Sequence, residues 1–399
     1  MEHQIHENPI CGTHEAQTLA QFYDVLSRAE RGALMADGHL GYVMPIGGVM
    51  AYREKISAVG VGFDIGCGNM AVQLDLKIEK LKLNEFLDQI QRNISFGIGQ
   101  KNPRAPQDHP LFDRPEWDAY PTPRIRNELK KLAREQLGTV GSGNHYVDIF
   151  ADSEKSIWIG VHFGSRGLGH RTAGGFLNLS LNKSWDSRVQ EVEVLLPLNK
   201  PLGESYFAAM TLSGAYAWAG REWVCQTIAD LLGAKIVQRI HNHHNFAWRE
   251  THQNEEYIVI RKGATPAFPG QRGFIGGSMG DPAVIIEGVD TPQSRLLLFS
   301  TVHGAGRIMS RRQAAGRIRG WDKKRKLLSP GKISWPMIHD WLREKEIVLR
   351  GGGLDEAPQV YRRLDQVLTA QGNTVKILHT LTPLGVIMAG ADEFDPYRD

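Results

Sequence analysis

The residue with the widest chemical range in this sequence is His303, in the run STVHGAGR at residues 300–307. An imidazole can act as a base, as a metal ligand, or as a nucleophile that carries a phosphoryl or nucleotidyl group. The glycines that follow it let the backbone approach a phosphate closely, and Arg307 can bind a phosphate with two hydrogen bonds. The run alone also fits a structural histidine on a glycine-rich turn, so residues elsewhere must decide its role.

Five other side chains are of types that bind metal ions: Asp64 and Cys67 in GFDIGCGN, His145 in GSGNHYVD, His162 in GVHFGSRGLGH and His244 in HNHHN. A thiolate with imidazoles and a carboxylate suits zinc, manganese, iron or cobalt. One turn can aim both Asp64 and Cys67 at the same point, and a thiolate can bridge two cations. Each residue alone also fits a buried structural role. All five, however, lie beside glycine or amide residues at expected strand ends, where binding groups are common.

Three histidines crowd into the run HNHHN at residues 241–245. Side chains alternate between the faces of an extended strand, so His241 and His243 share one face and His244 takes the other. One metal ion cannot use all three unless the strand contains a bulge. We therefore predict that His244, next to Asn245, is the ligand, and that His241 and His243 are structural or support the ligands from outside.

Three further regions are suited to anions. Arg166 lies in a glycine frame, GSRGLGH, and Arg307 and Arg311 would be neighbours if their segment were helical. Residues 261–269 and 276–281 offer backbone N–H groups and the hydroxyl of Ser278. The chain contains neither a GxxxxGK[ST] P-loop nor a dinucleotide fingerprint, so any nucleotide must be bound in another way. Zinc-ribbon and HExxH spacings are absent as well.

Both helices and strands are predicted to position these residues. Hydrophobic periodicity predicts helices over residues 15–32, 76–93, 125–136, 205–232, 335–345 and 356–370. It predicts buried strands at 156–162 and 234–241, another strand near 374–380, and alternating strands and glycine turns over 40–76. Residues 98–123, rich in proline, glycine and charge, are expected to form a long surface loop. The pattern indicates an α+β fold in one domain over residues 1–399.

Composition indicates the cellular compartment that we expect, but it does not identify a function. The 399 residues are 41% hydrophobic, and 47 Lys+Arg against 44 Asp+Glu leave a formal charge of +3, which neither requires nor excludes nucleic acid. Three cysteines are too few for a disulfide framework. With no apolar signal segment and no long apolar run, we expect a cytoplasmic protein without membrane contact.

One local cluster of charge stands out, the basic stretch at residues 311–328. Its eight basic residues are Arg311, Arg312, Arg317, Arg319, Lys323, Lys324, Arg325 and Lys326. The stretch fits either a solvated surface or a track for a nucleic-acid backbone.

Nine ordered runs, spread from about residue 30 to residue 390, resemble the RtcB family of RNA ligases. They are DGHLGYVMPIGGV (37–49), GVGFDIGCG (60–68), GTVGSGNH (138–145), HFGSRGLGH (162–170), HHN (243–245), RKGAT (261–265), GSMG (277–280), STVHGAGR (300–307) and DEAPQVY (355–361). The resemblance implies mixed β-sheets around a central metal cleft flanked by helices. It also implies that RNA ends with a 3′-phosphate or a 2′,3′-cyclic phosphate are joined to 5′-hydroxyl ends, with GTP and two Mn²⁺ ions.

Roles for individual residues follow from the same resemblance. It makes Cys67 the bridge between two metal ions, with Asp64 and His145 on one and His162 and His244 on the other. It makes His303 the nucleophile that takes GMP from GTP. The nucleotide would be held by Asn144, Asp148, Asn245, Ser278, Arg307 and Tyr361, and RNA phosphates by Arg166 and Arg311. The resemblance also implies a part in tRNA splicing or RNA repair and an archease-like activator. We expect a monomer.

The chain departs from the family pattern at four positions: Asp148 replaces a glutamate, Gly276 a proline, Ala283 a serine and Met388 a lysine. The resemblance places residues 148, 283 and 388 around the guanine, so these changes bear on base selection. Two alternatives therefore stand beside an RNA ligase. One is a divergent metal-dependent nucleotidyltransferase or phosphoesterase with another nucleotide specificity. The other is a non-catalytic RNA-end-binding protein, which His303 disfavours because a binder needs no nucleophile.

Overall fold

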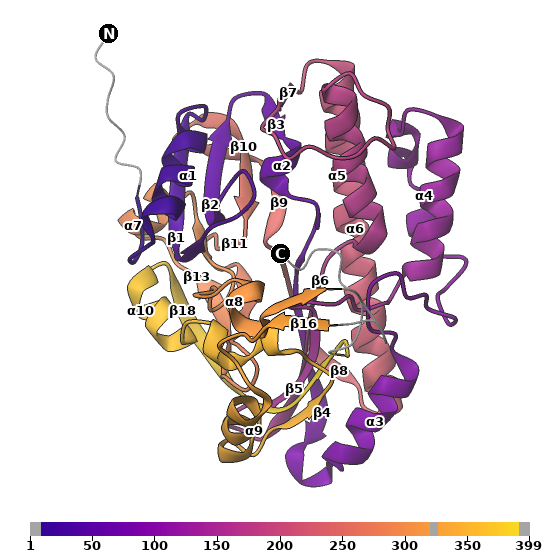
Figure 1. Cartoon of the computed structure of the whole chain (residues 1–399), viewed down its shortest axis with the longest axis vertical. Coiled ribbons are helices and arrows are strands. Elements are labelled where there is room, and N and C mark those ends of the chain that lie inside the picture. Colours follow the sequence, from indigo (N-terminus) through magenta and orange to yellow (C-terminus); the bar gives the residue numbers. More distant parts are fainter. Residues whose placement is uncertain (1–8, 320–325, 391–399) are drawn as a thin grey trace.

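The computed structural model describes residues 9–319 and 326–390, in which helices and strands are interspersed along the chain (Figure 1). The α-helices are α1 (Ala16–Leu26), α2 (Ala58–Val61), α3 (Leu83–Asn93), α4 (Pro123–Gln136), α5 (Arg166–Ser180), α6 (Pro201–Leu231), α7 (Pro292–Leu296), α8 (Arg311–Ala315), α9 (Trp335–Glu344) and α10 (Leu364–Gln371). Short 3₁₀ helices are η1 (Ile78–Lys80), η2 (Pro110–Asp113), η3 (Pro115–Ala119), η5 (Leu354–Glu356) and η6 (Pro358–Val360). The predicted α+β class is confirmed.

The largest sheet has eight strands and curls into a nearly closed barrel. In order across the sheet they are β12 (Arg272–Ile275), β13 (Ala283–Gly288), β18 (Val375–Met388), β5 (Tyr146–Ala151), β6 (Ser156–Phe163), β4 (Gly68–Lys77) and β8 (Ile236–His243), with β17 (Val348–Arg350) pairing with β18 outside this order. Two amide side chains link the ends of the sheet. Asn242 on β8 accepts a hydrogen bond from the backbone N–H of Phe274 on β12, and Asn69 on β4 donates to the Phe274 carbonyl, both at 2.9 Å.

The two faces of this sheet are filled differently. On β6, Ile159 packs toward helix α6 in one core cluster with Val224, whereas Trp158 shares another cluster with Phe274 inside the curl. Since residues two apart on a strand face the same way, His162 lies on the inner face with Trp158. Aromatic side chains thus fill the interior of the curl beside the position of His162.

A four-stranded antiparallel sheet stands beside the large one, in the order β1 (Arg31–His39), β2 (Ile46–Tyr52), β10 (Glu255–Lys262) and β9 (Asn245–His252). Strands β8 and β9 are joined at His244, so the chain crosses from the large sheet to the small one at a predicted metal ligand. Three two-stranded pairs complete the strands: β11 (Ala264–Pro266) with β14 (Ser300–Val302), β3 (Lys55–Ser57) with β7 (Leu195–Pro197), and β15 (Arg317–Arg319) with β16 (Lys326–Ser329).

Helices α4, α5 and α6 run side by side along one flank, opposite the small sheet (Figure 1). Helix α4 begins with a capped first turn, two residues before the predicted start at residue 125: the hydroxyl of Thr122 accepts a hydrogen bond from the N–H of Ile125, and Pro123 occupies the first turn. Its buried residues Ile125, Leu129 and Ala133 recur every four positions. Within the described residues, none of the helices combines the length and the apolar character that a membrane span needs.

Several predicted elements were wrong in extent. The helix predicted from residue 15 ends at Leu26, and the next strand begins at Arg31. The helix predicted over 76–93 begins only at Leu83, because β4 runs to Lys77 and η1 follows. Instead of one helix over 356–370, α10 starts at Leu364, since residues 354–360 form η5 and η6. The strand predicted near 374–380 continues to Met388 through a register shift at Pro383, which has no N–H to pair.

Residues 98–123 are not the surface loop that their composition suggested. Leu111, Phe112, Trp117 and Tyr120 are buried in the core that α5 and α6 line. The Trp117 indole N–H donates to the Leu111 carbonyl at 3.0 Å. Proline and charge marked the turns of this segment correctly, but its four buried apolar side chains fix it to the helical layer.

A buried ion pair supports the segment that leads to His303. Arg261 on β10 is fully buried and donates to both carboxylate oxygens of Glu250 at 2.6 and 3.0 Å. It also donates to the Ser300 hydroxyl and to the Leu298 carbonyl, both at 2.8 Å. Leu298 and Phe299 have φ values of 53° and 47°, a left-handed conformation that non-glycine residues rarely adopt.

Removing one partner of this pair is expected to destabilise the protein strongly. Glu250→Gln or Arg261→Met should lower the free energy of unfolding by about 3–5 kcal/mol, because the remaining buried charge would lose its partner of opposite charge. Urea denaturation followed by circular dichroism measures this. Arg53→Met is the matched control, since Arg53 pairs with Glu255 at the surface and its loss should leave the midpoint unchanged. Equal midpoints for the buried and surface variants would contradict the prediction.

Candidate active site

Strand register brings four of the five predicted metal ligands to one end of the large sheet. Strand β4 lies between β6 and β8, and Asn69 pairs with His162 on one side and with Asn242 on the other. Cys67 directly precedes β4 and His244 directly follows β8, so both lie level with His162. His145 directly precedes β5, whose first residue pairs with His162. The ligands come from distant parts of the sequence, and antiparallel pairing aligns them.

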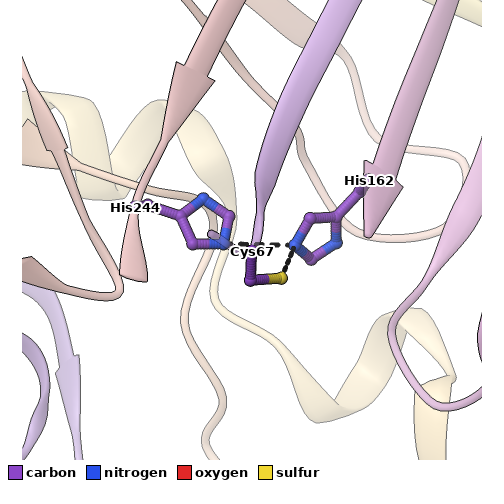
Figure 2. Close-up of side chains that lie close together, drawn as sticks. All are labelled: Cys67, His162 and His244. Carbon is purple, nitrogen blue, oxygen red and sulfur yellow. Dashed lines mark hydrogen bonds between the residues drawn. The ribbon is translucent and has the colours of Figure 1, made fainter. Parts of the chain in front are cut away.

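Cys67, His162 and His244 form the first ligand group. Figure 2 shows the three side chains converging from β4, β6 and the β8–β9 junction. The Cys67 Sγ lies 3.3 Å from the His162 Nε2, which lies 3.2 Å from the His244 Nε2. All three side chains are buried. One cation between them would contact a sulfur and two nitrogens.

The protonation of His162 suits a metal ligand. Its Nδ1 lies 2.9 Å from the carbonyl oxygen of Asn144, which can only accept, so Nδ1 carries the proton and Nε2 presents a lone pair to the group. Burial lowers the pKa of His162 to about 3, so the ring is neutral at pH 7. Burial also holds the pKa of His244 well below its ordinary value, and the buried Nδ1 of His244 has no hydrogen-bond partner among the described residues. Neutral imidazoles beside a cysteine fit a borderline metal such as manganese or zinc.

Asp64, Cys67 and His145 form the second group, and it shares the cysteine with the first. The His145 Nε2 lies 3.0 Å from the Asp64 Oδ2 and 3.7 Å from the Cys67 Sγ. Burial raises the pKa of Asp64, but the hydrogen bond and charge of His145 outweigh it, and the net pKa lies below its usual range. Arg166, at φ 54°, reaches the His145 Nδ1 at 3.3 Å. In the structure Arg166 therefore contacts the candidate ligand His145 through the ring nitrogen that does not face Asp64.

Space for the Asp64 carboxylate depends on a glycine. A Cβ added at Gly164 would lie 2.0 Å from the Asp64 Oδ1, well inside any real contact. Gly164, the first glycine of the GSRGLGH run, is therefore needed to leave space for Asp64. The same run also carries Arg166. The side chain of Asn245 also supports this loop, donating to the Asp64 carbonyl at 3.4 Å and accepting from the Gly263 N–H at 2.8 Å.

His303 is held by a residue that the sequence analysis missed, Asp37. The His303 Nδ1 lies 2.6 Å from the Asp37 Oδ2, which also accepts the backbone N–H groups of His303 at 2.9 Å and Gly304 at 3.2 Å. The Asp37 side chain is fully buried. A carboxylate can only accept here, so the proton lies on Nδ1 and Nε2 carries the ring's free lone pair. The signal was present, because Asp37 opens the run DGHLGYVMPIGGV.

His303 and the first ligand group meet in one cavity. The rings of His303 and His244 lie edge to face with centroids 4.9 Å apart. The cavity has a volume of about 360 Å³. Twelve of the predicted site residues line it: Asp64, Cys67, Asn144, Asp148, His162, His244, Asn245, Ser278, His303, Arg307, Arg311 and Tyr361. The remaining two predicted site residues do not line the cavity. His145 contacts Asp64, and Arg166 contacts His145.

Arg307 and Arg311 come together by a route other than the predicted one. Helix α8 begins only at Arg311, so the two are not neighbours on one helix. Both instead bind Glu356: Arg307 at 3.3 Å, and Arg311 in a shorter contact that is supplemented by the Asp355 carboxylate at 2.9 Å. Tyr361 donates to Glu356 and accepts from Arg307 at 2.9 Å. Two buried acidic residues thus hold both guanidinium groups at the cavity wall.

Positions 148, 276, 283 and 388 have different environments. Asp148 and Met388 line the cavity. Asp148 is buried, its Oδ1 has no hydrogen-bond partner among the described residues, and burial raises its pKa well above the ordinary value. Gly276 also lines the cavity, and a Cβ there would lie 2.2 Å from the Tyr146 hydroxyl oxygen. Ala283 lies instead in the sheet interior, fully buried.

Two other predicted features have structural explanations. The hydroxyl of Ser278 donates to Asp281 at 2.5 Å, and Asp281 also binds Arg363 at 2.6 Å, so the GGSMGD loop is fixed from within. His241 and His243 lie outside both ligand groups, as strand alternation predicted, and contact Arg221. Of the basic stretch, Lys323, Lys324 and Arg325 lie outside the described residues, and its role as a backbone track stays a prediction.

The family model and the relatives that match this chain carry the same family name. A family model described as "tRNA-splicing ligase RtcB" matches residues 19–389. The tRNA-splicing ligase RtcB of Thermococcus kodakarensis is 29% identical over 88% of this chain and 86% of its own. The RNA-splicing ligase RtcB of Escherichia coli K12 is 29% identical over 88% of both chains. The tRNA-splicing ligase RtcB of Nanoarchaeum equitans is 30% identical over 89% of this chain and 87% of its own.

Proposed function

Because the chain belongs to the RtcB family, we propose that it is an RNA ligase that joins 3′-phosphate or 2′,3′-cyclic phosphate ends to 5′-hydroxyl ends through a nucleotidylated His303. Two Mn²⁺ ions and GTP are the proposed cofactors. We propose that one catalytic domain spans residues 1–399 and acts as a cytoplasmic monomer, with broken or intron-excised RNA as substrate and an archease-like activator as a further partner.

The orientation of His303 is the observation that carries this proposal. Asp37 holds the proton on Nδ1, which leaves Nε2 as a nucleophile, and the His244 ring lies 4.9 Å away in the same cavity. Three hydrogen bonds from this segment to one buried carboxylate oxygen fix the ring and its tautomer. A nucleophile that attacks along one line benefits from a fixed ring and a fixed tautomer.

The ligand groups support a two-metal site. Cys67 would contribute its sulfur to both ions, with Asp64 and His145 completing one set and His162 and His244 the other. Metal ions bound there would polarise phosphoryl oxygens and neutralise developing charge. Arg307 and Arg311, held in place by Glu356, would bind phosphate oxygens in the same cavity.

The reaction then proceeds in three displacements. His303 Nε2 attacks the α-phosphorus of GTP and pyrophosphate leaves, which forms a phosphoramidate. The RNA 3′-phosphate, formed by water addition if the end is cyclic, attacks the same phosphorus, releases His303 and takes GMP. The 5′-hydroxyl finally attacks the RNA phosphorus, loses its proton and displaces GMP. Asp37 keeps Nδ1 protonated throughout, so Nε2 is both the attacking and the leaving atom.

Three residues that line the cavity bear on nucleotide choice: Asp148, Tyr361 and Met388. Asp148 presents a buried carboxyl oxygen without a partner to the cavity, which suits a hydrogen-bond donor on a base. Tyr361 lines the same cavity. Met388 offers only an apolar surface where the family pattern has a lysine. A divergent enzyme of altered nucleotide specificity is therefore the second candidate, and the experiment below separates it from a GTP-dependent ligase.

Labelling of His303 tests the proposed function. The full-length protein is incubated with Mn²⁺ and, separately, with each of four ribonucleoside triphosphates that carry a radioactive α-phosphate. Wild-type protein should acquire an acid-labile covalent label on a denaturing gel, and His303→Ala should acquire none. The preferred nucleotide identifies the base. His339→Ala, an exposed histidine on α9, is the matched control and should label normally. Metal-loaded wild-type protein that takes no label from any nucleotide would reject the proposal.

A further inference from the structure

Helix α6 carries a fully buried arginine, Arg221, whose described hydrogen-bond partners include no carboxylate. Burial lowers the pKa of Arg221 to about 10, so the guanidinium stays charged at pH 7. A buried charge is expensive, and structural arginines in a core are normally paired with an acidic side chain. Arg221 instead donates to two backbone carbonyls and to the His241 ring, and it contacts the His243 ring, so its presence needs another explanation.

Three of the residues that Arg221 contacts are chain neighbours of the three residues in the first ligand group. One guanidinium nitrogen, Nη1, donates to the Gly66 carbonyl at 3.0 Å and to the Phe163 carbonyl in a shorter contact. The other, Nη2, lies 3.0 Å from the His243 Nδ1. Gly66 precedes Cys67, Phe163 follows His162, and His243 precedes His244. One side chain therefore binds the three segments that carry the thiol and the two imidazoles.

The same contacts explain the two histidines of HNHHN that coordinate nothing. His241 accepts from Arg221 at 2.8 Å, and its ring stacks on Trp218 of α6 with centroids 4.8 Å apart. The His243 ring stacks on Phe246 with centroids 5.3 Å apart. A guanidinium has no lone pair to accept with, so His241 accepts from Arg221 through a bare nitrogen. The His243 Nδ1 also lies 2.9 Å from the Gly66 carbonyl, which can only accept, so this nitrogen donates to Gly66 and contacts the guanidinium without accepting from it. Burial, followed by the nearby Arg221 charge, lowers the pKa of both.

Small residues of helix α6 also leave space for the loop that Arg221 contacts. A Cβ added at Gly66 would lie 3.0 Å from the Gly214 Cα and 3.2 Å from the Ala217 Cβ, so the loop before Cys67 rests directly on small residues of the helix. Arg221, one turn further along α6, then reaches past the loop to β6 and β8. Helix, loop and both strands meet at a single guanidinium.

We propose that Arg221 is a positioning residue for the metal centre, which sets the spacing of Cys67, His162 and His244 by holding the residue next to each of them. The inference rests on the metal site of the proposed function, but not on nucleotide transfer or ligation. Residues that orient ligands from outside typically change metal affinity by about 10–100-fold when they are replaced. A guanidinium is suited to this task because its planar fork donates in several fixed directions, which an ammonium group cannot match.

Metal binding by the apoprotein tests this without RNA or nucleotide. Mn²⁺ affinity is measured by titration calorimetry, and Co²⁺ is added to report the thiolate–metal absorption band and the geometry of the ligands. Arg221→Lys and Arg221→Met should both weaken metal affinity by about 10–100-fold and alter the cobalt spectrum. Arg239→Met is the matched control, because Arg239 lies on β8 but pairs with Glu222 at the surface, and it should bind metal as wild type does.

A second pair of variants keeps the test decisive if Arg221 variants do not fold. His243→Leu removes the ring nitrogen that contacts both Arg221 and the Gly66 carbonyl, whereas His243→Asn retains a polar amide close to the place of Nδ1. The leucine variant should weaken metal affinity and alter the spectrum, and the asparagine variant should restore both.

Wild-type affinity and spectrum in every folded Arg221 variant and in His243→Leu would overturn the proposal. A loss of thermal stability with unchanged affinity would do the same, since it would make the arginine purely structural. If wild-type protein binds metal but takes no nucleotide label, the proposed function fails while this inference stands.

Discussion

Cys67→Ala is expected to abolish nucleotide transfer to His303 and to remove both metal ions together. The sulfur of Cys67 belongs to both ligand groups, at 3.3 Å from the His162 Nε2 and 3.7 Å from the His145 Nε2. Each ion would be left with two protein ligands. The loss of affinity should therefore exceed the about 10–100-fold that follows replacement of a residue outside the ligand set. Elemental analysis after dialysis against Mn²⁺, together with labelling by the α-labelled nucleotide, measures both effects.

Cys225→Ala is the matched control for this experiment. Cys225 is a second fully buried cysteine, but it lies in the apolar core between α6 and the large sheet. Its replacement should lower thermal stability through a small cavity and leave the metal content unchanged. Retention of two ions and of full labelling by Cys67→Ala would show that the sulfur is no bridge and that the shared-ligand assignment is wrong.

Asp37→Asn is expected to slow nucleotide transfer by three to four orders of magnitude while metal content stays at the wild-type level. The amide removes the negative charge beside the His303 Nδ1. The proton is then held less firmly on Nδ1, and the positive charge that the ring gains when Nε2 attacks is stabilised less. The same substitution in serine-protease triads, where an aspartate also orients an imidazole, costs about 10⁴-fold in rate. The single-turnover rate of His303 labelling is the appropriate measurement, because it reports the first displacement alone.

The surface variant Asp290→Asn controls for the amide substitution itself. Asp290 pairs with Arg295 at the surface, away from the cavity, so labelling should proceed at the wild-type rate. If Asp37→Asn labels as fast as this control, the buried carboxylate does not orient the nucleophile. If it labels slowly because metal has been lost, Asp37 supports the metal site and not the tautomer. Measuring metal content on the same samples distinguishes these results.

These two substitutions probe opposite sides of one arrangement. Cys67 lies at the end of the large sheet, whereas Asp37 lies near the end of β1 in the small sheet. His244, at the junction of β8 and β9, is the point where the sheets meet and where the His303 ring approaches the ligands. The proposed nucleophile and the proposed metal ligands therefore depend on how the two sheets are placed, and loss of either is expected to stop the same reaction.

The sequence by itself determined the kinds of residue that make the site and most of their identities. Hydrogen-bonding and ligand chemistry are properties of residue types, so Asp64, Cys67, His145, His162 and His244 could be selected by type and by their glycine-rich neighbours. Strand alternation, a local property, separated His244 from His241 and His243. The fold class and the long helix α6 followed from periodicity, which is local as well.

Tertiary structure decided everything that depends on residues far apart in the chain. Asp37 meets His303 across 266 positions, and Arg307 and Arg311 converge on Glu356 and not along a helix. The buried segment at residues 98–123 was misjudged because proline and charge describe turns, whereas burial depends on what packs against them. Arg221 carried no sequence signal at all: an arginine within a helix becomes a support for three ligands only when sheet register aligns their neighbours around it. The sequence specifies the type of each residue. The distances between residues depend on strand pairing and packing, which only the folded chain establishes.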